Sequence, residues 1–133
     1  MFTIKKYVVV DSLEEAYKLN KSKKANVLGG LLWMKMGKKT IQTAIDLSNL
    51  NLDKIEENDE CFEIGAMVRL RDLEVHEGLN NYFNNAIKDC VKSIVGVQFR
   101  NCATVGGSIF SRFGFSDPLT CLLALDSYVK LYK

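Results

Sequence analysis

The chain has 133 residues, is 47% hydrophobic and 26% charged, and carries a formal net charge of +2, all of which is typical of a globular protein with one ordinary domain or two small ones. No apolar run approaches the roughly 20 residues that a membrane-spanning helix needs, and the N-terminal stretch has no features of a signal peptide. The sequence therefore indicates no membrane segment and favours a cytoplasmic protein.

Charge is unevenly divided along the chain. Residues 1–54 carry ten Lys/Arg against five Asp/Glu, whereas residues 55–133 carry eight against eleven. The lysines are scattered and have no aromatic residues between them, which argues against a nucleic-acid partner. A basic N-terminal half suits an anionic ligand or an acidic partner, but it is equally typical of a solvated face.

Cysteine and histidine spacing indicates no metal site. The cysteines are Cys61, Cys90, Cys102 and Cys121; none forms a Cys-x-x-Cys pair, and His76 is the only histidine. We expect four reduced, mostly buried cysteines and a surface position for His76. No Ser/His/Asp or Cys/His set predicts a catalytic residue.

Residues 1–53 predict a small α+β lobe. A β-branched run predicts a strand over 7–10, and Ser12 with Glu15 forms a capping box for a helix over 13–21. A short buried strand ends at the glycines of "ANVLGG", "LLWMKMG" predicts a turn of helix, and "KKTIQTAIDLSNL" predicts a strand that ends near Asp46. These elements form a β–α–β unit with a further strand.

Residues 54–133 predict a second α+β lobe. Its elements are a hairpin with "ENDE" as the turn, a short helix in "RLRDLEVHEGL", an amphipathic helix over 80–95, a loop in "VQFRNCATVGGSIF" and a helix that starts at Pro118. The last segment, "SYVKLYK", alternates like a strand. Because a domain rarely ends on an unpaired edge strand, we expect the second lobe to be incomplete and the chain to be part of a larger domain.

Two glycine pairs, Gly29–Gly30 and Gly106–Gly107, each follow an apolar run. Successive N–H groups in such bends bind anions, so two loops that face each other across a lobe boundary would hold a pyrophosphate from both sides, with about 1.5–3 kcal/mol for each charge-assisted bond. Thr104 and Ser108 offer hydroxyls to phosphate or ribose, and Asp117 offers a carboxylate to sugar hydroxyls or a ring N–H. Neither loop is a dinucleotide or P-loop fingerprint, and either pair alone would also suit an ordinary turn.

Five segments together resemble a known family. They are "VLGGLLWMKMG", "IDLSNLNLDKI", "FEIGAMV", "QFRNCATVGGSI" and "SDPLTCLLALDSYVKL". In this order and spacing, over about residues 5–133, the chain resembles the FAD-binding subunit of the molybdenum hydroxylases, which include xanthine dehydrogenase and aerobic carbon monoxide dehydrogenase. The resemblance implies a two-lobed α+β flavin domain of the vanillyl-alcohol oxidase/MurB type, with FAD bound noncovalently across the lobes.

The resemblance also implies which residues contact FAD. By position, the first flavin loop is Val27, Leu28, Gly29, Gly30, Leu31, Leu32 and Trp33, the second is Thr104, Val105, Gly106, Gly107 and Ser108, and Asp117 is the nearby carboxylate. Ile94 falls where the family packs an apolar side chain near the cofactor. The family's first loop usually reads Ala-Gly-Gly-Thr-Asp-Leu-Leu, so Leu31 and Leu32 replace a polar pair: the backbone amides persist, but the hydroxyl and carboxylate contacts do not.

The function implied by the resemblance is electron transfer. In the family, electrons leave a molybdenum cofactor, cross the iron–sulfur clusters of a partner, reach FAD and pass to NAD or another acceptor. The implied partners are a molybdopterin-binding large subunit and a 2Fe-2S small subunit, and no side chain of this chain needs to be catalytic. Two other interpretations remain open: a noncatalytic, flavin-free module that docks partner subunits, and a MurB-like reductase, against which the Arg-Asn-x-Ala-Thr signature counts.

Overall fold

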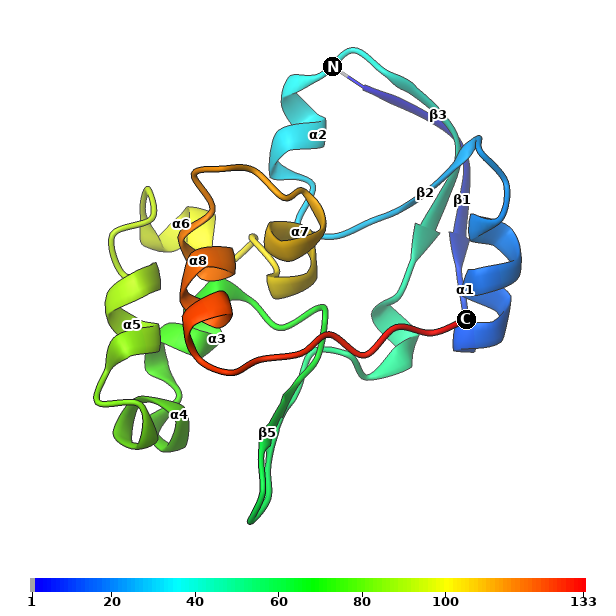
Figure 1. Ribbon diagram of the computed structural model, residues 1–133. Coiled ribbons are helices and arrows are strands. Elements are labelled where there is room, and N and C mark those ends of the chain that lie inside the picture. The colour runs from blue at the N-terminus through cyan, green and yellow to red at the C-terminus, as the bar shows by residue number, and fades with distance from the viewer. Residues whose placement is uncertain (1) are drawn as a thin grey trace.

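A three-stranded parallel sheet forms the N-terminal part of the computed structural model, which describes residues 2–133 (Figure 1). Its strands are β1 (Thr3–Val9), β2 (Ala25–Val27) and β3 (Thr40–Asp46), and β3 lies in the centre. Parallel neighbours need crossover connections, and α1 (Leu13–Asn20) and α2 (Leu32–Met36) lie in the two crossovers. The predicted β–α–β unit with a further strand is confirmed, although β1 begins four residues before the predicted strand.

Helix α1 begins where the capping pattern predicts. The Ser12 hydroxyl accepts the Glu15 N–H at 3.1 Å, and the Glu15 carboxylate accepts the N–H of Asp11 at 3.1 Å. One apolar cluster packs α1 against the sheet, and a second packs the α2 segment against it. The buried members of the two clusters are Val10, Ala16 and Ile45, and Leu28, Ile41 and Ala44.

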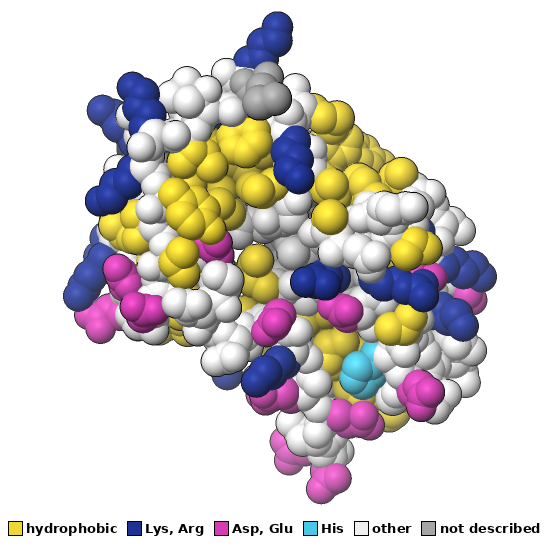
Figure 2. All heavy atoms as spheres, turned by 180° about the vertical axis from the view of Figure 1, so that it is seen from behind, with side chains coloured by type: hydrophobic (Ala, Val, Ile, Leu, Met, Phe, Trp, Pro, Cys, Tyr) yellow, Lys and Arg dark blue, Asp and Glu magenta, His cyan; other side chains and the backbone are white. Residues whose placement is uncertain are grey.

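The predicted hairpin is present and connects the sheet to the helical part of the chain. Strands β4 (Ile55–Glu57) and β5 (Phe62–Ile64) pair antiparallel, and the 3-10 helix η1 (Ser48–Leu50) precedes them. In the turn, the Asn58 side-chain oxygen accepts the N–H groups of Glu60 and Cys61, both at 2.9 Å. Figure 2 shows acidic side chains gathered around the protruding end of the molecule, while many basic ones lie toward the opposite end.

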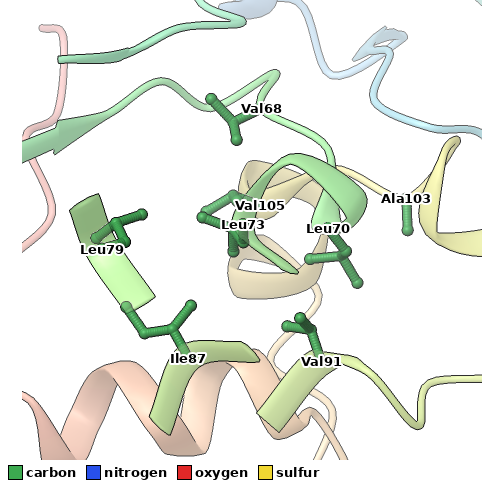
Figure 3. Packing of buried hydrophobic residues seen from close by; sticks show 8 residues of the cluster. All are labelled: Val68, Leu70, Leu73, Leu79, Ile87, Val91, Ala103 and Val105. Atoms are coloured by element: carbon green, nitrogen blue, oxygen red, sulfur yellow. The ribbon is translucent and has the colours of Figure 1, made fainter. Parts of the chain in front are cut away.

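Six short helices follow β5 within residues 2–133 and enclose one apolar core (Figure 3). Their bounds are α3 (Leu70–Val75), α4 (Glu77–Tyr82), α5 (Ala86–Val91), α6 (Val97–Arg100), α7 (Val105–Phe110) and α8 (Asp117–Ala124). The buried core residues are Val68, Leu70, Leu73, Leu79, Ile87, Val91, Ala103 and Val105. These residues come from four of the helices (α3, α4, α5 and α7), from the segment after β5 and from the segment before α7, so the core fixes the position of α7.

The single helix expected over 80–95 is wrong. The chain turns at Asn84 and Asn85, whose φ angles of 50° and 63° are left-handed, so α4 ends at Tyr82 and only 86–91 continue as helix. The buried Asn80 side chain stabilises this break, because its oxygen accepts the Lys88 N–H at 3.0 Å while its nitrogen donates to three carbonyls of the α3–α4 corner. The predicted apolar stripe is nevertheless confirmed, since Ile87 is buried and its neighbours along the stripe pack on the core.

Four other expectations need correction. The short helix expected in "RLRDLEVHEGL" is two helices, because His76 ends α3 and its Nδ1 accepts the Leu79 N–H at the start of α4. The expected loop over 97–110 contains α6 and α7. Residues 127–133 form no strand and are exposed, because no neighbouring strand pairs with them within residues 2–133. The cysteines are free as expected, but Cys102 is exposed and the other three are only half-buried. None of the helices within residues 2–133 has the length and apolarity to cross a membrane.

Candidate binding site at the two glycine pairs

The first glycine pair begins a series of consecutive backbone N–H groups that donate no hydrogen bond within residues 2–133. Leu28 is buried, and its N–H still donates to the Ile45 carbonyl at 2.8 Å, which fixes the end of β2. From Gly29 to Met34, in contrast, no N–H group donates to any other part of residues 2–133. Leu31 has φ 63° and ψ 2°, and the helical conformation follows at Leu32. A left-handed residue beside a right-handed one curls successive N–H groups into an anion-binding concavity.

The second glycine pair lies in the first turn of α7 rather than in a loop. Thr104 is the N-cap, and its hydroxyl accepts the Gly107 N–H at 3.2 Å. The N–H groups of Val105 and Gly106 donate to the carbonyls of Val68 and Ala66, both at 2.8 Å. In this arrangement the three amides have partners inside the protein, so the expected symmetry between the two glycine loops is absent.

The two glycine pairs lie in contact, as a shared binding role requires. Figure 1 shows the segment between β2 and α2 passing beside α7. A Cβ on Gly29 would lie 2.9 Å from the Thr104 hydroxyl oxygen and 3.8 Å from the Cα of Gly107. A Cβ on Gly30 would overlap the Cys102 carbonyl group and lie 3.1 Å from the Cα of Ala103. Segments about seventy positions apart therefore meet through glycine backbones, which only residues without a Cβ allow. We call this contact the glycine junction.

Gly106 has a different reason for being glycine. A Cβ there would lie 2.7 Å from the Ala66 carbonyl oxygen and 2.9 Å from the Ala66 Cβ. Gly106 thus allows α7 to pack against the segment after β5, whereas Gly107 is exposed and lies next to the junction.

Ser108 and Asp117 lie progressively further from the junction. The Ser108 hydroxyl donates to the Thr104 carbonyl at 3.0 Å. Asp117 is the first residue of α8 and lines a shallow depression with residues of α5, including Cys90. Burial raises the pKa of the Cys90 thiol to about 12, and Cys121 and the Asp117 carboxylate add to this shift. The structure therefore places the Asp117 side chain beside α5, and it shows no hydrogen bond from that side chain to either glycine pair within residues 2–133.

A buried ion pair supports the segment that leads into the junction. Arg100 donates to the Glu74 carboxylate at 2.7 Å and to the Ile94 carbonyl at 3.0 Å. Arg71 adds a second contact to Glu74 at 2.8 Å. The hydrogen bond from Arg100 is the main cause that holds the pKa of Glu74 below its usual value. Because Arg100 is bonded to α3 and also holds the Ile94 carbonyl, the residues that follow Arg100 reach Gly30 in a fixed position.

Three aromatic rings beside the junction form a cluster that the sequence analysis did not anticipate. Trp33 lies 5.5 Å from Phe113 and 6.0 Å from Phe115, measured between ring centroids, and the two phenylalanine rings stack at 5.1 Å. The only signal in the sequence was the alternation of Phe113 and Phe115 in a glycine-containing loop. That alternation shows nothing of their contact with a tryptophan eighty positions earlier.

The fold is a mixture of helix and sheet, and the unpaired amides at the glycine junction offer hydrogen-bond donors to an anionic ligand. The family is given by sequence comparison: the profile of the FAD binding domain in molybdopterin dehydrogenase matches residues 2–133. The chain belongs to this family, and FAD is the cofactor that the family indicates.

Two curated proteins are similar in sequence to this chain over most of its length. The uncharacterized protein YgfM of Escherichia coli K12 is 30% identical over 93% of this chain and 48% of its own length. The 6-hydroxypseudooxynicotine dehydrogenase complex subunit alpha of Paenarthrobacter nicotinovorans is 28% identical over 92% of this chain and 44% of its own length. The chain thus spans about half the length of the curated relatives it matches.

Solved structures have the same fold. A carbon monoxide dehydrogenase from Hydrogenophaga pseudoflava aligns with a TM-score of 0.63 and 25% identity, over 78% of this chain and 38% of that chain. A Cu,Mo-CO dehydrogenase aligns with a TM-score of 0.70 and 20% identity, over 84% of this chain and 41% of that chain.

The glycine junction fits a diphosphate. Six consecutive N–H groups without partners supply hydrogen-bond donors, and the absence of a Cβ at Gly29 and Gly30 lets the loop that carries them pack against Cys102, Ala103 and Thr104. The hydrogen-bond donors for a diphosphate come from the first loop alone. The second loop supplies the surface against which the first loop packs.

Proposed function

We propose that this chain is the FAD-binding part of a molybdopterin-dependent dehydrogenase, and that the glycine junction holds the FAD diphosphate. The observation that carries the proposal is the run of unpaired amides from Gly29 to Met34, held against α7 by glycine contacts. FAD when bound would supply the redox chemistry, and the protein supplies its position and electrostatic surroundings.

The proposed FAD contacts are those that the sequence analysis names. They are Val27, Leu28, Gly29, Gly30, Leu31, Leu32 and Trp33 in the first loop, Thr104, Val105, Gly106, Gly107 and Ser108 in the second, and Asp117. The first loop binds phosphate through backbone N–H groups. Since Leu31 and Leu32 have no polar side chain, binding there depends on the backbone alone. The second loop positions the first through Thr104, Gly107 and the Cys102 carbonyl.

In the complete assembly, we propose that electrons pass from a molybdopterin-binding large subunit through a 2Fe-2S small subunit to FAD and then to NAD or another acceptor, in the cytoplasm. This assignment is supported by family membership and by the relative described as a dehydrogenase complex subunit. We also propose a two-lobed arrangement of the vanillyl-alcohol oxidase/MurB type for the complete domain. Xanthine dehydrogenase is one member of the class that fits this organisation.

The alternative of a flavin-free docking module is favoured by one observation, the loss of polar side chains at Leu31 and Leu32. A titration of the purified chain with FAD separates the two functions, with quenching of flavin fluorescence as the readout and FMN as the control for the diphosphate. We expect saturable binding of FAD and weaker binding of FMN. Saturable binding that Gly30→Ala weakens supports the proposal, whereas a chain that stays folded and leaves FAD fluorescence unchanged at every concentration contradicts it.

A further inference from the structure

We propose that Trp33, Phe113 and Phe115 form a stacking surface for a planar heteroaromatic ring of the bound dinucleotide. This inference rests on the proposed function, because it assigns to residues of this chain a second contact with the same FAD molecule. It differs from the diphosphate site in using side chains, and in using two residues, Phe113 and Phe115, that belong to neither glycine loop.

The three rings are arranged as an open surface rather than as a closed core. Phe113 and Phe115 are parallel within 7°, and Trp33 is tilted by 55° and 53° against them. The exposed fractions are 56% for Trp33, 39% for Phe113 and 66% for Phe115, although each ring already contacts the other two. Aromatic faces are favourable surfaces for other planar rings, whose stacking requires no particular hydrogen-bond pattern.

The position of the cluster identifies the class of ligand. Trp33 is itself one of the residues with an unpaired N–H, so its indole is joined directly to the proposed diphosphate site. Phe113 and Phe115 lie in the segment between α7 and α8, and α7 begins at the junction. A ligand that places phosphate on the Gly29–Met34 amides and extends along this surface carries an anionic group next to a planar ring, which is the chemistry of both halves of FAD.

Charge favours the same occupant. Residues 1–54, which contain Trp33 and the unpaired amides, carry ten basic against five acidic residues. An anionic dinucleotide is attracted by this part of the chain, whereas an apolar protein surface would gain nothing from it. The shared chemistry is a planar ring linked to phosphate, and the adenine and isoalloxazine rings are the two sources that the experiment distinguishes.

The test compares FAD binding by the wild-type chain with binding by Trp33→Leu and Phe115→Leu, using flavin fluorescence. Tyr128→Leu is the matched control, because Tyr128 is 83% exposed and has no ring partner within residues 2–133. We expect Trp33→Leu and Phe115→Leu to weaken FAD binding by about tenfold or more, Trp33→Phe to lose less, and Tyr128→Leu to match wild type. Urea unfolding of each variant shows whether the fold is retained.

A second measurement uses the wild-type chain alone. Trp33 is the only tryptophan, so acrylamide quenching of protein fluorescence reports its accessibility directly. We expect saturating ADP or FMN to protect Trp33, and the one that protects identifies the adenine or the isoalloxazine half as the stacked ring. If neither ligand protects and the leucine variants bind FAD like wild type, the stacking surface is refuted while the diphosphate site stands. If FAD does not bind to the folded wild-type chain, both proposals fail.

Discussion

Replacing Gly30 by alanine tests the glycine junction most directly. The added Cβ would lie 2.7 Å from the carbonyl carbon of Cys102, whereas ordinary contacts begin near 3.4 Å, and the carbonyl oxygen would be closer still. The neighbouring backbone would therefore have to move by more than about 0.7 Å. It is held in place by hydrogen bonds from the Cys102 N–H to Phe99 at 3.0 Å and from the Leu70 N–H to Ala103 at 2.9 Å, so the strain is not relieved locally.

The expected cost follows from two opposing effects. Overpacking of this kind costs about 1–3 kcal/mol, and the smaller conformational freedom of alanine in the unfolded chain offsets about 0.4–1 kcal/mol of it. The free energy of unfolding should fall by about 1–2 kcal/mol. With an unfolding entropy of about 2.1 cal/mol/K per residue over 133 residues, the midpoint temperature should fall by about 4–7 °C.

Thermal and urea unfolding followed by circular dichroism measure this change, and FAD titration measures its effect on binding. Gly114→Ala is the matched control, because no atom lies within 4 Å of the added Cβ and its backbone is not left-handed. We expect Gly114→Ala to equal or slightly exceed wild-type stability. If Gly30→Ala is as stable as Gly114→Ala and binds FAD as well as wild type does, the two loops do not meet as described.

Three further changes test the surroundings of the junction. Glu74→Gln leaves the buried Arg100 guanidinium without its carboxylate, so unfolding in urea should require about 3–5 kcal/mol less. The pKa of Glu74 is lower in the folded chain than its ordinary value of 4.5. The ionised carboxylate therefore contributes fully to the free energy of unfolding above pH 4.5, and this contribution is lost as the pH falls through the folded-state pKa. The urea midpoint should show this acid-side decline in wild type but not in Glu74→Gln. Thr104→Ala removes the acceptor of the Gly107 N–H and should lower the free energy of unfolding by about 1 kcal/mol. Thr104→Ser keeps a hydroxyl acceptor and should retain most of the wild-type stability. Equal loss in both variants would contradict the capping role. Burial and Cys121 raise the pKa of Cys90 from 9.0 to about 12, so iodoacetamide at mildly alkaline pH should modify Cys90 much more slowly in the native than in the urea-unfolded chain. Mass spectrometry of the 89–92 tryptic peptide measures both rates, and equal rates would disprove this protection.

Local chemistry predicted much of the fold. Ser12 and Glu15 located the start of α1, and Asp117–Pro118 located the start of α8, because caps and proline act through hydrogen bonds and sterics within a few residues. The helix expected over 80–95 failed for the opposite reason. Its apolar spacing was correct, but Asn80 bonds to residues of α3 and α5, and such tertiary partners are not visible in the periodicity of one segment.

The candidate site was predicted in outline and not in detail. Glycine pairs after apolar runs indicated a close backbone approach, and Gly29 and Gly30 do contact the segment from Cys102 to Gly107. Which amides are free could not be predicted from the sequence, because the N–H groups of Val105 and Gly106 donate to the distant carbonyls of Val68 and Ala66. Trp33 was named only as a loop position, since its ring partners lie in a distant segment.

The difference between the two glycine pairs has a consequence for the way this domain binds FAD. In the second pair, Gly106 packs against Ala66: its N–H donates to the Ala66 carbonyl, and a Cβ would overlap Ala66. A substitution of Gly106 would therefore lower the stability of the fold before it affected FAD binding. In the first pair, the amides that follow Gly29 are unpaired, and the left-handed Leu31 orients them at a conformational cost of about 1–2 kcal/mol relative to a helical residue. The Leu31 carbonyl accepts the Lys35 N–H at 2.8 Å, but the Leu31 N–H has no partner within residues 2–133. An anion on the Gly29–Met34 amides would supply partners for these N–H groups, and bound cofactor would therefore stabilise the conformation of the first loop.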